Sequence, residues 1–313
     1  MTVDVISADL PVGESLVIRK NRITPQGNAE NMKRISVITG THGDELEGQY
    51  VCWELARRIN ENPQYLNGVV DIYPALNPLG IVTITRGIPG FDLDMNRIFP
   101  GEKDGTMPEF IADGIINDIS GSDVAIDIHA SNIFLTEMPQ VRINEITRDT
   151  LVPLARRLNI DFIWVHSNAT VLESTLAYSL NAIGTRTLVV EMGVGMRITR
   201  EYGNALVDGI FVLMKDLGIW TGDVITPKKP IEALDEQCRV HFINASSSGI
   251  FISDVSHGAQ LKKGEHIGVI ADTLSGNVFE EIKSPCDGLL FTLREFPVVD
   301  EGSLIARILA SEE

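Results

Sequence analysis

The sequence predicts an α/β fold, a sheet with helices on both faces, followed by a small β domain. Three observations support this prediction. Short apolar runs typical of buried strands alternate with amphipathic helical patterns up to about Trp220. Polar residues suited to chemistry directly follow several of these runs, where α/β sheets usually form their sites. Beyond Trp220 the helical periodicity ends, and short apolar pieces are separated by Gly, Ser and Asp.

Each expected element rests on apolar spacing and on the residues that flank it. Val51, Leu55 and Ile59 recur at every fourth position, which predicts an amphipathic helix that ends at Asn62-Pro63. The other expected helices lie near residues 111–119, 146–158, 175–182 and 205–217. The expected strands are an edge strand at 14–22 and further strands at 34–39, 69–73, 124–128, 162–165 and 187–190.

The change in sequence pattern after Trp220 divides the chain into two expected domains, residues 1–225 and 226–313. Thr226-Pro-Lys-Lys-Pro230 has the composition of a linker. In the second part, Lys283-Ser-Pro-Cys-Asp-Gly resembles the half-motif of lipoyl and biotinyl barrel-sandwich domains. The methionine-flanked lysine that carries the prosthetic group in those domains is missing. We therefore expect an all-β, barrel-sandwich-like domain without such a cofactor.

Composition excludes some classes of binding partner and indicates the cellular compartment. The 313 residues include 44% apolar residues and carry a net charge of −17, which argues against binding to nucleic acid or to an anionic membrane surface. The three cysteines, Cys52, Cys238 and Cys286, are widely spaced and form no disulfide framework. The first residues lack the pattern of a signal peptide, and no apolar run reaches the roughly 18 residues of a membrane span. We expect a cytoplasmic protein.

The segment His42-Gly-Asp-Glu45 places a histidine and a carboxylate between a strand and a helix. His129 follows a later strand, so its imidazole can join them if the two strands are neighbours. Two histidines and one carboxylate, with one position open, form the ligand set of a catalytic zinc site. Asp127 lies on the same face of its strand as His129 and is a candidate acceptor for the imidazole N–H. The alternative is that both histidines are ordinary polar loop residues.

Glu191 ends the apolar run that begins at Thr187, just before a glycine-rich turn. Burial at a strand end raises the pKa of a carboxyl group, which suits a general base that later acts as general acid. The alternative is a structural acceptor for N–H groups of the turn. These observations together predict a metal-dependent hydrolase.

The loop Thr85–Pro100 carries two arginines in an acidic chain. Asn96 and Arg97 could hold a substrate carboxylate, and Arg86 could stabilise the oxyanion that forms when water attacks an amide. Surface salt bridges are the alternative for either arginine. We expect His166 to be a structural histidine, and His241, His257 and His266 to be surface residues unless the β domain covers the pocket.

Other enzyme classes lack their motifs. The chain has no G-x-S-x-G elbow, no phosphate-binding G-x-x-x-x-G-K-[ST] loop and no G-x-G-x-x-G after a strand. These absences argue against an α/β-type serine hydrolase and against nucleotide-dependent chemistry.

Four ordered motifs, His42-Gly-Asp-Glu45, Met95-Asn-Arg-Ile-Phe-Pro100, Asp-Ile-His129 and Glu191-Met-Gly, resemble the succinylglutamate desuccinylase and aspartoacylase family of the zinc carboxypeptidase clan. The resemblance implies a three-layer α/β/α sandwich around a mixed sheet, and cleavage of N-acylated amino acids. It implies one zinc ion held by His42, Glu45 and His129. The Glu-Met-Gly-x-Gly form resembles bacterial deacetylases of the N-acetyl-diaminobutyrate type.

The resemblance also implies roles for the remaining candidates. Glu191 would be general base and acid, Arg86 would polarise the scissile carbonyl, and Asn96 with Arg97 would bind a carboxylate. The chain departs from the family at Asp44, where Asn is frequent, and its last tyrosine is Tyr202, so the tyrosine that aspartoacylases bring from the C-terminal domain is missing.

Three functional hypotheses follow from these residues. The first is a zinc-dependent deacylase acting on a small N-acyl amino acid, and the resemblance adds a homo-oligomeric state. The second is a carboxypeptidase acting on short peptides, because the same groups can cleave a C-terminal residue. The third is a metal-binding protein without catalytic activity.

Overall fold

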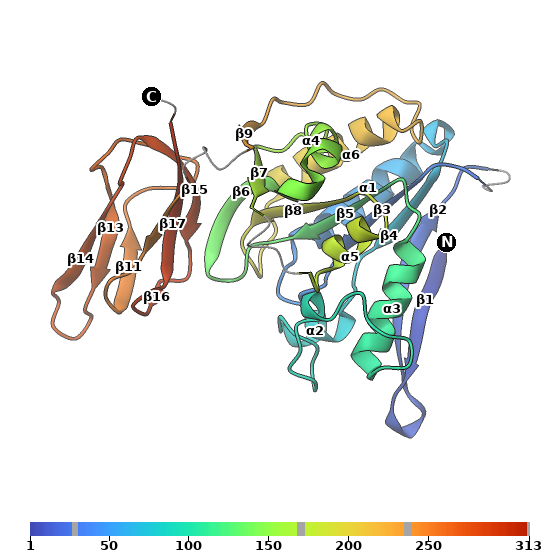
Figure 1. Cartoon of the computed structure of the whole chain (residues 1–313), viewed down its shortest axis with the longest axis horizontal. Helices are drawn as coiled ribbons and strands as arrows, with labels where there is room; N and C mark the ends of the chain where they lie inside the picture. The colour runs from blue at the N-terminus through green and yellow to red at the C-terminus, as the bar shows by residue number, and fades with distance from the viewer. Residues whose placement is uncertain (27–30, 168–172, 235–239, 312–313) are drawn as a thin grey trace.

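The computed structural model describes residues 1–26, 31–167, 173–234 and 240–311. The α/β part and the β part lie side by side, with the β part next to β6 and β7 (Figure 1). The helices are α1 (Glu47–Glu61), α2 (Pro78–Thr83), α3 (Met107–Ile119), α4 (Arg148–Ala155), α5 (Leu176–Ala182) and α6 (Arg200–Asp216). The strands of the α/β part are β1 (Thr2–Asp9), β2 (Ser15–Ile23), β3 (Arg34–Thr39), β4 (Val69–Tyr73), β5 (Val124–His129), β6 (Leu135–Asn144), β7 (Phe162–His166) and β8 (Thr187–Gly193). The later strands are β9 (Ile231–Ala233), β10 (Val240–Asn244), β11 (Gly249–Ser253), β12 (Gln260–Leu261), β13 (His266–Ala271), β14 (Val278–Lys283), β15 (Gly288–Arg294), β16 (Val298–Val299) and β17 (Leu304–Ala310).

The central sheet is mixed. Its strands β4, β3, β5 and β8 are parallel neighbours, whereas β2 pairs antiparallel with β4, and β6 pairs antiparallel with β8. The parallel strands end at one edge of the sheet, so the residues that follow β3, β5 and β8 come together there. The predicted mixed sheet is confirmed.

The helices cover both faces of this sheet, each over its own hydrophobic core. One core joins the even-numbered residues of β5, such as Ile126, to α1, α4 and α6. The other joins Ala125 of β5 and Ile38 of β3 to α3 and α5. The alternation of side chains along a strand assigns the apolar residues to both cores, as expected for a three-layer sandwich.

The β part continues the central sheet. The first half of β6 pairs with β15, and the sheet goes on through β17 to β10. A second sheet, β14-β13-β11-β16, packs with these strands around a separate apolar core that includes Phe251 and Ile305. The short strand β9 pairs with β7 of the α/β part, although it lies beyond residue 225. The domain boundary at residue 225 remains a prediction.

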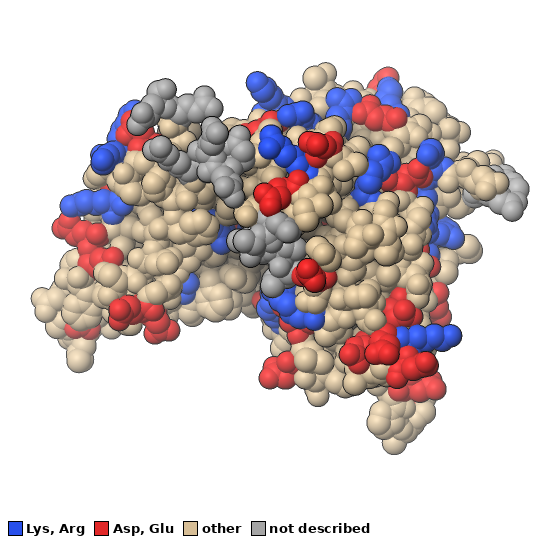
Figure 2. Space-filling view, in the orientation of Figure 1, with Lys and Arg blue, Asp and Glu red and all other residues tan. Residues whose placement is uncertain are grey.

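Two strands, β1 and β6, were not expected from the sequence. β6 contains Pro139, which argues against a strand, but the proline lies in a register shift between Glu137 and Gln140 where a ladder hydrogen bond is not needed. On the part of the chain that the structure describes, no helix is long and apolar enough to cross a membrane. Acidic and basic side chains alternate over the described part of the face in Figure 2, without a large basic patch.

Gly43, between the two candidate ligands of the first loop, is packed against the backbone of α2. A Cβ atom at this position would lie 1.9 Å from the carbonyl carbon of Gly80 and 2.4 Å from the nitrogen of Ile81. We expect Gly43→Ala to lower the free energy of unfolding by about 1–3 kcal/mol, because backbone atoms cannot move aside cheaply. Urea denaturation of the metal-free protein measures this loss, and an unchanged midpoint would contradict the packing described here.

Candidate active site

The first half of the site is the loop between β3 and α1. His42 and Glu45 are both buried there, and the Nδ1 atom of His42 lies 2.8 Å from the Oε1 atom of Glu45. The Gly43 N–H donates to the Thr85 carbonyl at 3.0 Å, which fixes the loop against the segment that follows α2. The tight turn therefore directs the imidazole and the carboxylate to the same point, as the sequence predicted.

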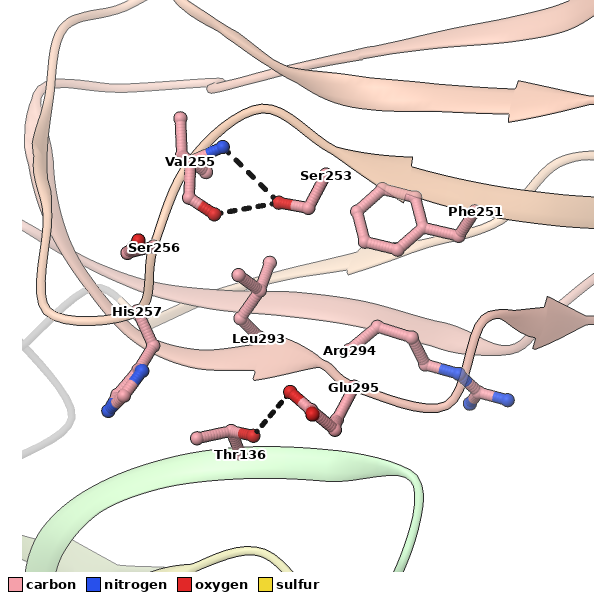
Figure 3. A pocket seen from close by; sticks show the side chains of 9 residues that line it. All are labelled: Thr136, Phe251, Ser253, Val255, Ser256, His257, Leu293, Arg294 and Glu295. Carbon is pink, nitrogen blue, oxygen red and sulfur yellow. Dashed lines mark hydrogen bonds between the residues drawn. The ribbon is translucent and has the colours of Figure 1, made fainter.

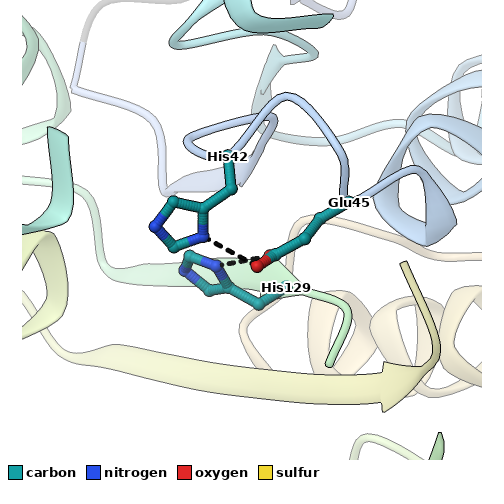
Figure 4. A group of neighbouring side chains, drawn as sticks. All are labelled: His42, Glu45 and His129. Carbon is teal, nitrogen blue, oxygen red and sulfur yellow. Dashed lines mark hydrogen bonds and ion pairs between the residues drawn. The ribbon is translucent and has the colours of Figure 1, made fainter. Parts of the chain in front are cut away.

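His129 completes the group from the end of β5. Its Nδ1 atom lies 2.9 Å from the second oxygen of Glu45, Oε2, which also accepts the Ala130 N–H at 3.2 Å. Figure 4 shows the two imidazoles converging on the one carboxylate. One ligand atom from each of these three buried residues lies within 4.8 Å of the other two.

This donor set fits a metal ion. Imidazole nitrogen and carboxylate oxygen are the ligands that zinc uses in catalytic sites, and the two Nδ1 atoms face the same carboxylate. The protein thus holds the three side chains that the sequence predicted as ligands in a convergent arrangement.

Both histidines have a second carboxylate behind them. The Nε2 atom of His42 lies 3.0 Å from Asp94, and the Nε2 atom of His129 lies 3.2 Å from Asp127. A carboxylate on the far nitrogen fixes the ring orientation and raises the basicity of the facing nitrogen. Asp127 was expected in this position, whereas Asp94 was not assigned a role from the sequence.

The charges of the group are strongly coupled. Burial alone would lower the pKa of His129, but the charges of Asp127 and Glu45 outweigh it. Burial alone would raise the pKa of Glu45, but its contacts with His129 and His42 outweigh it. The pKa of His129 therefore lies well above its usual value, and the pKa of Glu45 lies well below. The contacts of His42 with Asp94 and Glu45 likewise raise its pKa against burial. The surrounding carboxylates thus favour the protonated form of both imidazoles.

Glu191 lies near the end of β8, directly opposite His129 in the strand register. Burial raises the pKa of its carboxyl group to about 7, although the positive charges of Arg142 and His129 oppose this shift. Arg142 of β6 donates from Nη1 to Oε1 of Glu191 at 3.3 Å. The geometry thus places a carboxyl group with the pKa of a general base beside the proposed metal ligands.

The arginines of the loop Thr85–Pro100 lie close to Asp94. Arg86 donates to Asp94 at 3.0 Å and to Glu45 at 3.2 Å, so its guanidinium spans the ligand group and the carboxylate behind it. Arg97 lies 3.9 Å from Asp94 and is about as exposed as Arg86. The Oδ1 atom of Asn96 accepts the Leu176 N–H at 2.9 Å at the start of α5, which gives Asn96 a structural contact besides its predicted role.

Among the other histidines, His166 stacks on Trp164, with ring centroids 4.0 Å apart. Burial, with the charges of Arg142 and Arg307, lowers the pKa of His166 to about 3. His166 is therefore neutral at physiological pH, in keeping with a structural role. His241 is partly buried, and His266 contacts Asp254 at 3.0 Å.

His257 differs from the expected surface histidine, because it is half-buried between the two parts of the chain. Its Nε2 atom lies 2.7 Å from the Tyr202 hydroxyl of α6. It lines a cavity of about 290 Å³ together with Thr136, Arg294 and Glu295, shown in Figure 3. The predicted site residues do not line this cavity.

Comparison with known proteins shows the family of this chain. Residues 31–217 match the sequence family described as the succinylglutamate desuccinylase/aspartoacylase catalytic domain. The chain belongs to the succinylglutamate desuccinylase/aspartoacylase family. The predicted resemblance and the prediction of a hydrolase of the deacylase type are therefore confirmed.

The similarity to individual members of this family covers most of the chain. It is 27% identical over 277 residues to the N-alpha-acetyl-L-2,4-diaminobutyric acid deacetylase of Halomonas elongata, covering 86% of this chain and 80% of the relative. Its fold is similar to a product-bound structure of the ectoine utilization protein EutE (DoeB) from Ruegeria pomeroyi, with a TM-score of 0.82, 21% identity and coverage of 99% and 93% of the two chains. A succinylglutamate desuccinylase structure from Silicibacter gives a TM-score of 0.83 at 22% identity, with the same coverage.

The raised pKa values of the two histidines predict that metal binding depends on pH. A metal must displace the imidazole protons, so we expect the apparent affinity for Zn²⁺ to be at least tenfold weaker at pH 6 than at pH 8. Isothermal titration calorimetry in buffers of different ionisation enthalpy measures both the affinity and the protons released. His129→Ala should release fewer protons, and an affinity independent of pH would contradict the charge state described above.

Proposed function

We propose that this protein is a zinc-dependent deacylase that hydrolyses the amide bond of a small N-acyl amino acid. The observation that carries the proposal is the convergence of His42, Glu45 and His129 on one point, with Glu191 next to His129 in the strand register. Membership of the family supports the reaction class. A bound zinc ion would act as a Lewis acid and lower the pKa of water to about 7.

Glu191 is the proposed proton carrier. As a carboxylate it accepts a proton from the attacking water, and as a carboxylic acid it returns that proton to the departing amine. Its burial keeps the two protonation states close in free energy near neutral pH, which both steps need. Because Arg142 occupies Oε1, the second oxygen is the one available for proton transfer.

Arg86 and Arg97 are the proposed cationic contacts of the substrate. Arg86 lies over Glu45, where its guanidinium can stabilise the negative charge that develops on the carbonyl oxygen. Arg97 is 43% exposed and can hold the carboxylate of the amino acid, with Asn96 beside it. We propose N-acetyl amino acids as the first substrates to examine, since the Halomonas relative is named as a deacetylase.

Two further features stay predictions. The cytoplasmic location and the homo-oligomeric state expected from the sequence belong to this proposal. The carboxypeptidase and the inactive metal-binding protein, also expected as alternatives, become outcomes of the test below.

The proposal predicts a large and specific effect of Glu191→Gln. We expect this variant to lose at least about 100-fold in kcat on the best N-acetyl amino acid, because the amide cannot carry the proton, while zinc content stays at one ion per chain. Steady-state kinetics on a panel of N-acetyl amino acids, N-succinyl amino acids and short peptides, with metal analysis of each sample, provides the measurement.

The matched control is Glu201→Gln, an exposed glutamate of α6 that should leave kcat unchanged. Preference for peptides would favour the carboxypeptidase, and the absence of any hydrolysis with zinc bound would favour the inactive protein. Equal activity of Glu191→Gln and the native enzyme would refute the role of Glu191.

A further inference from the structure

A cluster of charged side chains around the buried Glu137 connects the C-terminal β part to Glu191. We propose that Glu137 of β6 and Arg307 of β17 are positioning residues, which hold Arg142 against Glu191 and so make the β part necessary for catalysis. The inference rests on the proposed function of Glu191 as proton carrier.

Glu137 is the centre of the cluster and is fully buried. The Nη2 atom of Arg142 donates to both of its oxygens, each at 2.7 Å. Arg307 donates from Nη1 to Oε1 at 2.5 Å, and the Thr292 hydroxyl donates to the same oxygen at 3.2 Å. A carboxylate at this depth is stable only with such partners, so its position depends on the β part.

Arg142 links the position of Glu137 to that of Glu191, because its guanidinium contacts both carboxylates. While Nη2 holds Glu137, Nη1 donates to Oε1 of Glu191 at 3.3 Å. The guanidinium is planar and rigid, so the position of Glu137 fixes the direction in which Nη1 points. Arg142 thereby orients one oxygen of Glu191 and leaves the other for proton transfer.

Arg307 is itself held in place by aromatic rings. Its guanidinium carbon lies 5.7 Å from the centre of the Trp164 ring and 5.6 Å from that of Phe242. Its side chain is only 16% exposed. In the sheet, Arg307 is opposite Thr292, and Thr292 is opposite Glu137, so the contact crosses two strand pairs in register. This placement is built into the sheet and does not depend on a loop.

A purely structural role is the competing explanation, because the same contacts also attach the β part to the α/β part. The two explanations differ in what the loss of Arg307 does. A structural tie would lower stability and activity together, as the loss of any interdomain contact would. A positioning residue changes kcat beyond the change in stability, since a misdirected proton carrier affects the chemical step.

The test compares Arg307→Met and Arg307→Lys with Arg294→Met. Arg294 is an arginine of the same part, which lies 5.0 Å from the Phe134 ring and bonds to backbone carbonyls, but has no contact with Glu137 in the described structure. For Arg307→Met we expect kcat to fall about tenfold or more with KM within twofold of native. Arg307→Lys should recover much of this loss, because an ammonium group can still bind Glu137. Arg294→Met should keep kcat within twofold of native, whatever its melting temperature.

A double-mutant cycle shows whether Arg307 acts through Glu137. If it does, Arg307→Met combined with Glu137→Gln should lower kcat no more than the more damaging single variant. Additive losses would contradict the proposed connection. Equal losses of kcat in Arg307→Met and Arg294→Met, at equal loss of melting temperature, would overturn the proposal in favour of a structural tie.

Crystal structures of the native protein and Arg307→Met give a readout that needs no activity. We expect the distance between Nη1 of Arg142 and Oε1 of Glu191 to lengthen beyond hydrogen-bond range in the variant, to more than about 3.5 Å. A retained contact would overturn the positioning role. Failure of the proposed function is recognised separately, because it would make the native protein inactive or Glu191→Gln as active as the native enzyme.

Discussion

The site depends on one buried carboxylate, that of Glu45, which is shared by two imidazoles. Each of its oxygens faces one Nδ1 atom, from His42 on its own loop and from His129 on the next strand. Burying three such groups in one place is unfavourable unless their charges compensate, and here they do so with help from Asp94 and Asp127. The parallel strands β3 and β5 are neighbours, so the pairing of the sheet brings the two histidines to the same carboxylate.

β6 lies between the central parallel strands and the β part. It pairs with β8 on one side, and with both β7 and β15 on the other, so it joins the central strands to the β part. Arg142 of β6 contacts Glu191 on one side and Glu137 on the other, and Glu137 is buried under Thr292 and Arg307 of the β part. This arrangement underlies the proposal that the β part affects the chemistry of the site.

Most of the site could be predicted because its residues follow local rules. His42 and Glu45 share one turn, and His129 and Glu191 end apolar strands that the periodicity identifies. Asp94 could not be assigned, since its contact with His42 depends on how a long irregular loop folds back over the site. β6 was missed because Pro139 argues against a strand. The ion pair of Glu137 with Arg307 could not be predicted either, because the two residues are 170 positions apart in the sequence.

We propose that three side chains from two distant segments of the chain, the loop after β3 and the end of β5, bind a single ion. Anomalous diffraction at the zinc absorption edge, from crystals grown with zinc, locates the ion. We predict one strong peak within about 2.0–2.2 Å of Nδ1 of His42, Nδ1 of His129 and a carboxylate oxygen of Glu45. An absent peak at this position, or a peak bound by other residues while these three point elsewhere, would contradict it.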